Sequence, residues 1–316
     1  MHDLSRFLLR LILVTTLTMI IVSGIYLAIP PDQQHYYHGS ILKLDLLKNT
    51  PSPRIILVGG SNLAWGIDSE LIEQSLGVPV INDGLDVHLG IIPLVELRDY
   101  IEEGDIVIIS LEYYNFASVE EFYGIPQYQA DWIEFSPGRI KYLQESYRES
   151  LPMYNLILQR KINRWTNIFL YGENLTEFRG IYQSQYFNEY GDFIGHLKDK
   201  TPPGMNAEYG GFSINQLDEA YQFLEEYNQF ALSKGAIVFY EAPASRQTNC
   251  ELTGMKHIRK FFNVLQTRTM ISLLTNPKEI CYPDEYFYDT PFHLTAYGRK
   301  IRTEQLIQNL ITALGK

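Results

Sequence analysis

Three side chains of this 316-residue sequence have the types and spacing for acyl-transfer chemistry. Ser61 follows the apolar run Ile-Ile-Leu-Val and two glycines, which is typical of a strand that ends in a sharp turn. Asp289 and His293 lie one helical turn apart near the other end of the chain. A serine needs a base to become a nucleophile, and the base needs a partner that fixes its tautomer. The sequence therefore offers Ser61 as nucleophile, His293 as base and Asp289 as the group that orients the base.

Each of these features also has an ordinary structural explanation. A Gly-Gly-Ser turn often follows a strand for purely structural reasons, and Asp289 could simply cap the last helix beside a surface His293. The sequence around Ser61 is not a Gly-x-Ser-x-Gly nucleophile elbow, because Leu63 takes the second glycine position, and it is not a phosphate-binding loop. The combination of the three side chains is what favours catalysis.

Further residues follow the predicted strands and are expected beside the same crevice. Gly84 follows the second strand, where its N–H would serve as an oxyanion donor, and Gly60 would leave N–H groups free at the first turn. Glu112 follows the third strand, where a carboxylate would repel a developing oxyanion. Glu112 is therefore expected to bind a hydroxyl group or a cation, or to pair with an arginine.

The elements that must position these residues alternate between strands and helices. Asp68 and Gly77 suit the two ends of the first helix. This alternation predicts an α/β fold with a doubly wound parallel sheet, which presents ligands at the carboxyl ends of its strands. The pattern predicts strands at 54–58, 78–82, 105–111 and 236–240, and helices at 68–75, 91–101, 214–233, 255–274 and from 295 onward.

A mid-chain segment at 117–212 breaks this alternation and is interpreted as an insertion. It is rich in Tyr, Asn and Gln and contains Trp132 and Trp165. We expect it to lie over the carboxyl ends of the strands and to supply aromatic walls to the Ser61 crevice, since aromatic faces suit sugar rings. The alternative is that these aromatic side chains form a small core of the insertion itself.

The N-terminus is typical of a membrane segment. Residues 11–29 carry no charge and approach the ~20 residues needed to span a bilayer. Because Arg6 and Arg10 precede them, the positive-inside bias keeps the tail 1–10 in the cytoplasm and exports the chain beyond residue 29. A cleaved signal peptide is the rival interpretation, although the apolar run is long for one and no small-x-small site comes after it. We expect a single-pass anchor at 11–29, a stem at 30–50 and a periplasmic or extracellular domain at 51–316.

Composition excludes several classes of protein. A net charge of −11 argues against nucleic acid as a partner. The two cysteines, Cys250 and Cys281, are too few for a disulfide-stapled miniprotein or a four-cysteine zinc site. In an oxidising compartment they could pair, and two buried free thiols are the alternative. The histidines show no ligand spacing, so we expect no metal and no other cofactor.

On these residues the chain resembles the SGNH/GDSL hydrolase superfamily. The resemblance is strongest to its membrane-anchored branch, which includes cell-surface polysaccharide acetyltransferases and proteins that assist teichoic-acid D-alanylation. It covers residues 54–111 and 236–316 and implies a three-layer α/β/α sandwich with ester chemistry that needs no metal. By resemblance Ser61 is the nucleophile, His293 the base, Asp289 its orienting acid and Gly84 an oxyanion donor. The matching blocks are Gly60-Ser61-Asn62, Asn82-x-Gly84 and Asp289-x-x-x-His293-Leu-Thr.

The chain departs from the family pattern at three points. The first block reads Gly-Gly-Ser-Asn instead of Gly-Asp-Ser, and three residues rather than two separate Asp289 from His293. In the third block, Ser110-Leu-Glu112 replaces Gly-x-Asn. The asparagine of that block would be an oxyanion donor, and losing one such donor typically lowers the rate by about 10²–10³. Asn62, Gly84 and Glu112 are therefore the oxyanion or substrate-binding candidates.

The sequence predicts an exported, membrane-anchored serine esterase or O-acyltransferase that acts on an ester of a cell-surface or extracellular glycan. The resemblance also implies a membrane acyltransferase as a partner. The alternative is a catalytically weak or inactive accessory protein that binds a glycan or a membrane partner, which the missing third-block asparagine favours. Hydrolysis and transfer share an acyl-enzyme, so the sequence does not separate them.

Overall fold

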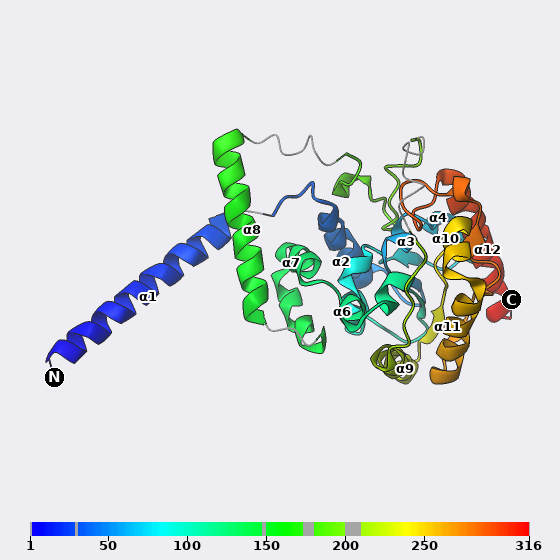
Figure 1. The fold of residues 1–316 in the computed structure, drawn as a ribbon, viewed down its shortest axis with the longest axis horizontal. Coiled ribbons are helices and arrows are strands. Elements are labelled where there is room, and N and C mark those ends of the chain that lie inside the picture. The colour runs from blue at the N-terminus through cyan, green and yellow to red at the C-terminus, as the bar shows by residue number, and fades with distance from the viewer. Residues whose placement is uncertain (1, 29–30, 147–149, 173–179, 200–209, 316) are drawn as a thin grey trace.

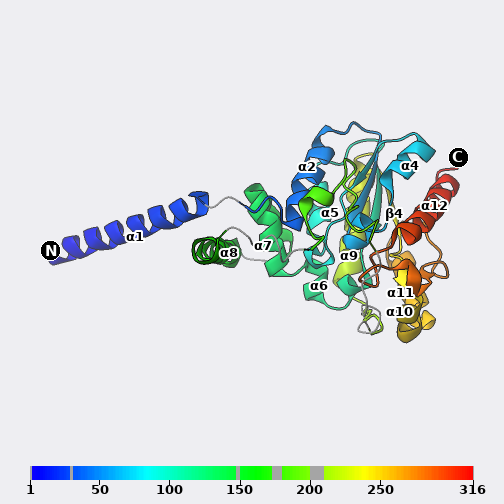
Figure 2. The ribbon, with the colours of Figure 1, turned by 90° about the horizontal axis from the view of Figure 1, so that it is seen from above.

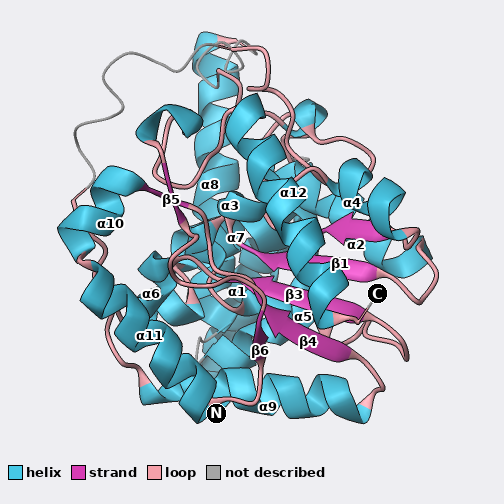
Figure 3. Ribbon diagram, turned by 90° about the vertical axis from the view of Figure 1, so that its right-hand side faces the viewer, coloured by secondary structure: helices cyan, strands magenta, loops and turns pink. Residues whose placement is uncertain are grey.

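The centre of the protein is a five-stranded sheet in which every pairing is parallel (Figure 3). The computed structural model describes residues 2–28, 31–146, 150–172, 180–199 and 210–315. The strand order is β2-β1-β3-β4-β6, and the α/β class predicted from the sequence is confirmed. The strands are β1 (Ile55–Gly59), β2 (Val80–Asn82), β3 (Ile106–Ser110), β4 (Ile237–Tyr240) and β6 (Ser272–Leu273).

Helices connect the strands and surround the sheet (Figure 3). Those of the sheet domain are α2 (Gly39–Asn49), α3 (Ser61–Ala64), α4 (Ser69–Leu76), α5 (Ile92–Leu97), α9 (Asp218–Ser233), α11 (Met255–Arg268) and α12 (Ala296–Ala313). The mid-chain segment holds α6 (Val119–Tyr123), α7 (Pro126–Phe135), η4 (Pro137–Ser146), α8 (Ser150–Tyr171) and η6 (Ser184–Tyr186). The other described elements are α1 (His2–Ala28), η1 (Tyr36–His38), η2 (Val87–Leu89), η3 (Tyr113–Phe116), β5 (Ser245–Arg246), α10 (Gln247–Thr253), β7 (Cys281–Tyr282) and η7 (Asp284–Tyr286).

Strand β1 is apolar and completely buried because helices cover both faces of the sheet (Figure 2). Ile55 and Leu57 point to one face and pack in a cluster with side chains of α4 and α12. Ile56 and Val58 point to the other face and join the larger core, to which α5, α9 and α11 contribute. The alternation of side chains along a strand thus divides the core into two layers.

The predicted boundaries hold closely for α4 and less well for three other helices, of which the one expected over 214–233 begins only at Asp218. Asp68 accepts a hydrogen bond from the Leu71 N–H at the start of α4, and Gly77 has a left-handed conformation (φ 67°) after its end, as predicted. The helix expected over 91–101 ends at Leu97. The helix expected over 255–274 ends at Arg268, because the chain then pairs with β4 as the edge strand β6. A two-residue strand has too little periodicity to be recognised in a sequence.

The segment expected to be a stem is part of the folded domain. Tyr36 and Tyr37 of η1 are buried in the larger core, which α2 also joins. The buried Lys43 donates a hydrogen bond of 2.6 Å from Nζ to the carbonyl oxygen of Asn82, at the end of β2. The domain therefore begins before residue 51, within a few residues of the apolar N-terminal helix.

Helix α1 projects away from the body of the molecule (Figures 1 and 2). Its segment Asp3–Gly24 is long and apolar enough to cross a membrane, and none of it is buried. The predicted projecting helix is thus confirmed, although it begins at His2, and residue 29 lies outside the described residues. By length and composition it is either a signal anchor or a signal peptide.

Cys250 and Cys281 form a disulfide bond that joins α10 to β7. The sequence left open whether these cysteines pair or remain two buried free thiols, and the structure shows that they pair. Disulfide bonds persist in oxidising compartments. Together with the apolar N-terminal helix, the bond suggests that the domain is exported.

Candidate active site

The strand order places a crevice between β1 and β3. Strand β2 lies on one side of β1 and the later strands on the other, so the winding direction reverses at this point. Open α/β sheets bind ligands at such a reversal, outside the carboxyl ends of the strands. Ser61 begins α3 directly after β1, and Glu112 lies two residues after the end of β3. Both residues are therefore at the position where this fold presents a site.

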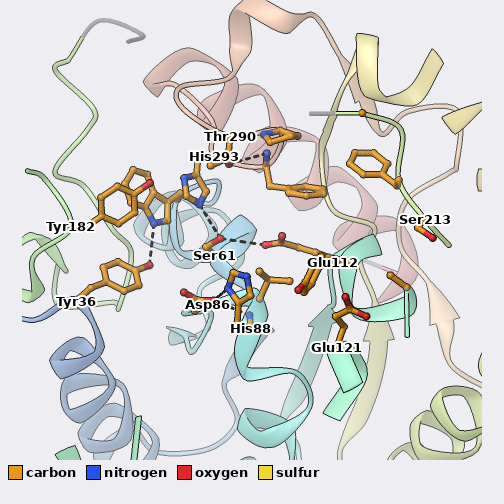
Figure 4. A pocket seen from close by; sticks show the side chains of 18 of the residues that line it. Tyr36, Ser61, Asp86, His88, Glu112, Glu121, Tyr182, Ser213, Thr290 and His293 are labelled. Atoms are coloured by element: carbon orange, nitrogen blue, oxygen red, sulfur yellow. Dashed lines mark hydrogen bonds and ion pairs between the residues drawn. The ribbon is translucent and has the colours of Figure 1, made fainter. Parts of the chain in front are cut away.

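Ser61, His293 and Asp289 form a continuous chain of hydrogen bonds in this crevice. The Oγ atom of Ser61 lies 2.8 Å from Nε2 of His293 (Figure 4), and Nδ1 of His293 lies 2.7 Å from Oδ1 of Asp289. When Nδ1–H donates to the carboxylate, Nε2 is left to accept the serine proton. The predicted convergence of these three side chains is confirmed.

A tight turn holds Asp289 and His293 on the same side of the chain. The Oγ1 atom of Thr290 accepts a hydrogen bond of 3.0 Å from the backbone N–H of His293, and the Tyr288 N–H donates to the His293 carbonyl oxygen at 2.8 Å. Thr295, not Asp289, caps the N-terminus of α12. Asp289 and His293 are each only 5% exposed. The alternative interpretation, in which Asp289 caps the last helix beside a surface His293, is therefore wrong.

Aromatic side chains that the sequence analysis missed fix the histidine and the aspartate. The Trp65 ring stacks on the His293 ring, with 4.2 Å between centroids and 8° between planes. The Nε1–H of Trp65 donates to the hydroxyl oxygen of Tyr36 at 3.0 Å, and the Tyr182 hydroxyl donates to Oδ2 of Asp289. Trp65 lies one helical turn after the serine, which is a weak signal in the sequence. Tyr182 comes from the mid-chain segment, and no pattern in the sequence indicates that it contacts Asp289.

These contacts keep the acid ionised. Burial alone would raise the pKa of the Asp289 carboxyl, but the hydrogen bonds from His293 and Tyr182 hold the pKa below its usual range. A second histidine, His196, lies on Trp65 with 4.6 Å between the ring centroids. Burial lowers the pKa of His196 to about 4, so this ring is neutral and adds no charge near the triad.

Ser61 lies between His293 and Glu112 (Figure 4). The Oε1 atom of Glu112 lies 3.3 Å from Ser61 Oγ, whose single proton points either to this oxygen or to His293, and it accepts a hydrogen bond of 3.1 Å from the backbone N–H of Asn62. Glu112 is 2% exposed, and burial raises the pKa of its carboxyl, partly opposed by the charge of His293 and the Asn62 hydrogen bond. Binding of a substrate hydroxyl or a cation by Glu112 stays a prediction, whereas the expected pairing with an arginine is not found: no arginine of the described residues forms a salt bridge with Glu112.

The side chain of Asn62 has a structural position instead of facing the pocket. It is completely buried, with Nδ2 donating to the Ser110 carbonyl oxygen and Oδ1 accepting from Nη2 of Arg302, both at 3.0 Å. These bonds tie the ends of β1 and β3 to α12. The Asn62 backbone N–H, which adjoins the serine and would suit an oxyanion, is engaged by Glu112.

Gly84 also lies away from the pocket lining. Its N–H donates a hydrogen bond of 3.1 Å to Oδ1 of Asn82, so the amide is not directed at the serine. A β-carbon at Gly84 would come within 2.5 Å of the β-carbon of Leu63. Glycine is therefore required here for close packing of the turn after β2 against α3, and the predicted role of its N–H as a free oxyanion donor is not what the structure contains.

The pocket that contains Ser61 has a volume of about 780 Å³. This size is typical of sites for small organic ligands. Its aromatic walls come from Tyr36 and Tyr37 of η1, Tyr114 of η3, and Tyr182 and Phe212. The expectation that the mid-chain segment supplies part of the wall is thus confirmed for its Tyr182 and Phe212.

The two tryptophans of that segment lie elsewhere. Trp132 is buried in the larger core, where the Arg139 guanidinium lies 4.1 Å from its ring centroid. Trp165 is on α8, 55% exposed, and does not line the pocket. Their expected role in stacking on a ligand at Ser61 is wrong. Trp132 instead fits the alternative, in which aromatic side chains of the segment form a core.

A second charged pair lines the pocket near Glu112. Nδ1 of His88 lies 2.7 Å from Oδ1 of Asp86, and the His88 ring stacks on Tyr128 at 4.2 Å. Burial lowers the pKa of His88, but the hydrogen bond and charge of Asp86 outweigh it and raise the pKa above its usual value. Asp86, Glu112 and Glu121 line the pocket, and neither lysine nor arginine does so among the described residues.

Comparison with known proteins does not identify a family for this chain: no family model matches the sequence, and the search of curated proteins finds no match. Among the residues that the structure describes, no three His, Cys, Asp or Glu side chains are grouped to hold a metal ion. The chemistry of the site is therefore inferred from its own side chains.

Proposed function

We propose that this protein is an exported, membrane-anchored serine esterase or O-acyltransferase that acts on an ester of a cell-surface or extracellular glycan. The observation that carries the proposal is the hydrogen-bonded chain from Ser61 through His293 to Asp289, which opens into a pocket at the switch point of the sheet. The same constellation activates a serine in several unrelated folds. The resemblance to SGNH hydrolases supports the same chemistry from the sequence.

The order of the hydrogen bonds defines the reaction. Ser61 Oγ attacks the ester carbonyl carbon while Nε2 of His293 takes its proton, and Asp289 stabilises the imidazolium that forms. The tetrahedral intermediate collapses, the bond to the alcohol breaks, and His293 returns the proton to the leaving alcohol. An acyl group then remains on Ser61. Water releases it in an esterase, and a sugar hydroxyl accepts it in a transferase, with His293 again acting as the base.

Glu112 has to be neutral for this reaction to be efficient. The substrate oxygen becomes negative beside Ser61, where an ionised carboxyl would repel it. A neutral Glu112 can keep accepting the Asn62 N–H on one oxygen and donate its own proton from the other to the substrate oxygen. Deep burial and the lack of a salt bridge among the described residues favour this form. Carboxylic acids in apolar sites do serve as oxyanion donors.

The pocket supports a glycan ester as substrate. Its tyrosines offer flat faces for sugar rings together with hydroxyl groups for hydrogen bonds. The disulfide and the apolar α1 are consistent with a domain outside the cytoplasm, where such glycans are found. A membrane acyltransferase that delivers the acyl group remains part of the proposal for the transferase case.

A covalent ester probe tests the proposal. The full-length protein in detergent is treated with a fluorophosphonate, and labelling is measured in the wild type, Ser61→Ala and Ser213→Ala. Ser213 lines the same pocket and is the matched control. We expect labelling of the wild type and Ser213→Ala and none of Ser61→Ala. Labelling that persists in Ser61→Ala would overturn the proposal. Turnover of acetylated oligosaccharides, with and without an added sugar acceptor, then separates hydrolysis from transfer.

One observation favours a second function, that of a non-enzymatic accessory protein. If Glu112 is ionised, its Oε1 atom occupies the oxyanion side of Ser61 and blocks chemistry while leaving the pocket open for binding. Such a protein would bind a glycan ester and leave the wild type unlabelled by the probe. Binding without labelling in both the wild type and Ser61→Ala would establish it.

A further inference from the structure

Helix α8 has two apolar stripes, and within the part of the chain that the structure describes only one of them packs into the body of the domain. Met153 and Ile157 are buried in the larger core beside α7. On the same side of the helix, Lys161 lies next to Glu134 of α7 in a buried ion pair. The second stripe is made of apolar residues spaced four, four, three and four apart, which puts them on one helix face. They are Tyr154, Leu158, Ile162, Trp165 and Phe169.

This second stripe is exposed along most of its length. Phe169 is 74% exposed, Trp165 55% and Tyr154 46%. The rings of Trp165 and Phe169 stack on each other, with 5.5 Å between centroids, and neither ring stacks on another described element. Single exposed apolar residues are ordinary, but a continuous row of large ones marks a surface that contacts something else.

The position of α8 indicates what covers the stripe. In both Figure 1 and Figure 2, α8 lies across the end of α1, between that helix and the body of the domain, and the two helices contact each other. Helix α1 has the length and hydropathy of a membrane span. A helix that crosses the exported end of a span lies at the membrane surface, where Trp and Tyr side chains are enriched.

We propose that α8 is a second membrane contact, in which the exposed stripe lies in the headgroup region of the bilayer that α1 spans. A helix with apolar and aromatic residues on one face and uncharged polar residues such as Gln159 and Asn163 beside it can lie in the plane of the interface. The occupant is a lipid surface and not a second copy of the chain. This inference concerns α8 and does not depend on the chemistry of Ser61.

The contact would fix the height of the Ser61 pocket above the bilayer. His35 lines the pocket and lies seven residues after Ala28, the last residue of α1. Seven residues span at most about 25 Å. With α1 and α8 both at the membrane, the pocket is held close to the surface, where it meets substrates that are attached to the membrane.

Fluorescence of Trp165 in proteoliposomes tests the proposal on the full-length chain. The other two tryptophans, Trp65 and Trp132, are buried, so Trp165 is the one that lipids can reach. Lipids brominated near the headgroup end of the acyl chain are expected to quench the emission, and lipids brominated near the terminal methyl to quench it less. Trp165→Phe should lose the quenched component, and aqueous iodide should have little effect on the wild type.

A matched pair of substitutions adds a charge on or off the stripe. Phe169→Asp should reduce the quenching by the brominated lipid and increase that by iodide, whereas Asn163→Asp, on the polar side of the same helix, should leave both unchanged. Near-UV circular dichroism and the melting temperature check that both variants are folded. Strong iodide quenching of the wild type would overturn the proposal. So would protection from both quenchers together with crosslinked dimers, which would assign the stripe to a second copy.

Discussion

The Oε1 atom of Glu112 lies 3.3 Å from Oγ of Ser61, and Nε2 of His293 lies 2.8 Å from the same serine oxygen. The serine is thus held between the proposed base and a buried carboxyl. An ionised Glu112 opposes the negative charge that acyl transfer creates, and a neutral one stabilises it. Under the proposed function, the protonation state of this carboxyl therefore decides whether the site turns over esters or only binds them.

The first prediction is a change in the pH profile on Glu112→Gln. Activity needs neutral Glu112, so it falls as the pH rises through the raised pKa of that carboxyl. We expect kcat/KM of a neutral ester in the wild type to fall on the alkaline side of its pH profile. Glutamine is neutral at every pH and keeps a donor, so Glu112→Gln should keep activity and lose the alkaline fall.

Two comparisons distinguish this role from others. Glu112→Ala removes the donor and should lower kcat by about 10²–10³ across the pH range. If the carboxyl instead binds a cationic substrate, Glu112→Gln would weaken an amine-bearing ester selectively, contrary to the prediction. Five groups interact electrostatically with Glu112. They are His293, Asp86, His88, Tyr36 and Arg302. A profile that keeps its alkaline fall in Glu112→Gln assigns that fall to one of them.

The second prediction concerns stability and needs no substrate. Burial raises the pKa of Glu112 in the folded protein, so between the unfolded and folded values the native state binds more protons. The free energy of unfolding then falls as pH rises through that window. Glu112→Gln should remove this contribution, and its stability relative to the wild type should be higher above the window than below it. Urea unfolding at several pH values measures the free energy of unfolding of both proteins. If this free energy changed equally with pH in the wild type and in Glu112→Gln, the prediction would be wrong.

The third prediction separates the two hydrogen bonds on Asp289. Asp289→Asn leaves the shape of the site but allows the wrong histidine tautomer, and we expect kcat to fall by roughly 10⁴. Tyr182→Phe removes one hydrogen bond to the ionised carboxylate, worth about 1.5–3 kcal/mol. We therefore expect a smaller loss in kcat, roughly ten- to a hundred-fold, with the rate of ester turnover as the measurement. A Tyr182→Phe variant as inactive as Asp289→Asn would show that the tyrosine has another role.

The sequence predicted the parts of the site that local pattern determines. Ser61 was recognisable because a buried apolar strand and two glycines precede it, and β1 does end there. Asp289 and His293 are four residues apart, so one turn brings them together without help from the rest of the chain. Their meeting with Ser61 was predicted from the resemblance to SGNH hydrolases, because neither Asp289 nor His293 directly follows a strand of the five-stranded sheet.

The contacts that are distant in sequence were not predictable in this way. Tyr182 reaches Asp289 from 107 positions away, and Trp65 donates to Tyr36 across 29 positions. No periodicity or motif marks such pairs, since they depend on how the mid-chain segment and η1 pack. Gly84 was misjudged for a related reason: a sequence shows that a glycine is present but not whether its N–H is already engaged, here by Asn82.

The last prediction concerns the disulfide between Cys250 and Cys281. It closes a loop with a sequence separation of 31, so chain entropy predicts a stabilisation of about 3–4 kcal/mol. The bond also fastens α10, whose Thr253 accepts a hydrogen bond of 2.6 Å from the N–H of the pocket-lining Phe212. We expect the double variant Cys250→Ser/Cys281→Ser to unfold at lower denaturant concentration and to bind ester substrates more weakly, with a raised KM and nearly unchanged kcat, because the triad lies on other elements. Reductant should have the same effects on the wild type and none on the double variant. A loss of kcat without a change in KM would instead connect the disulfide to the triad itself.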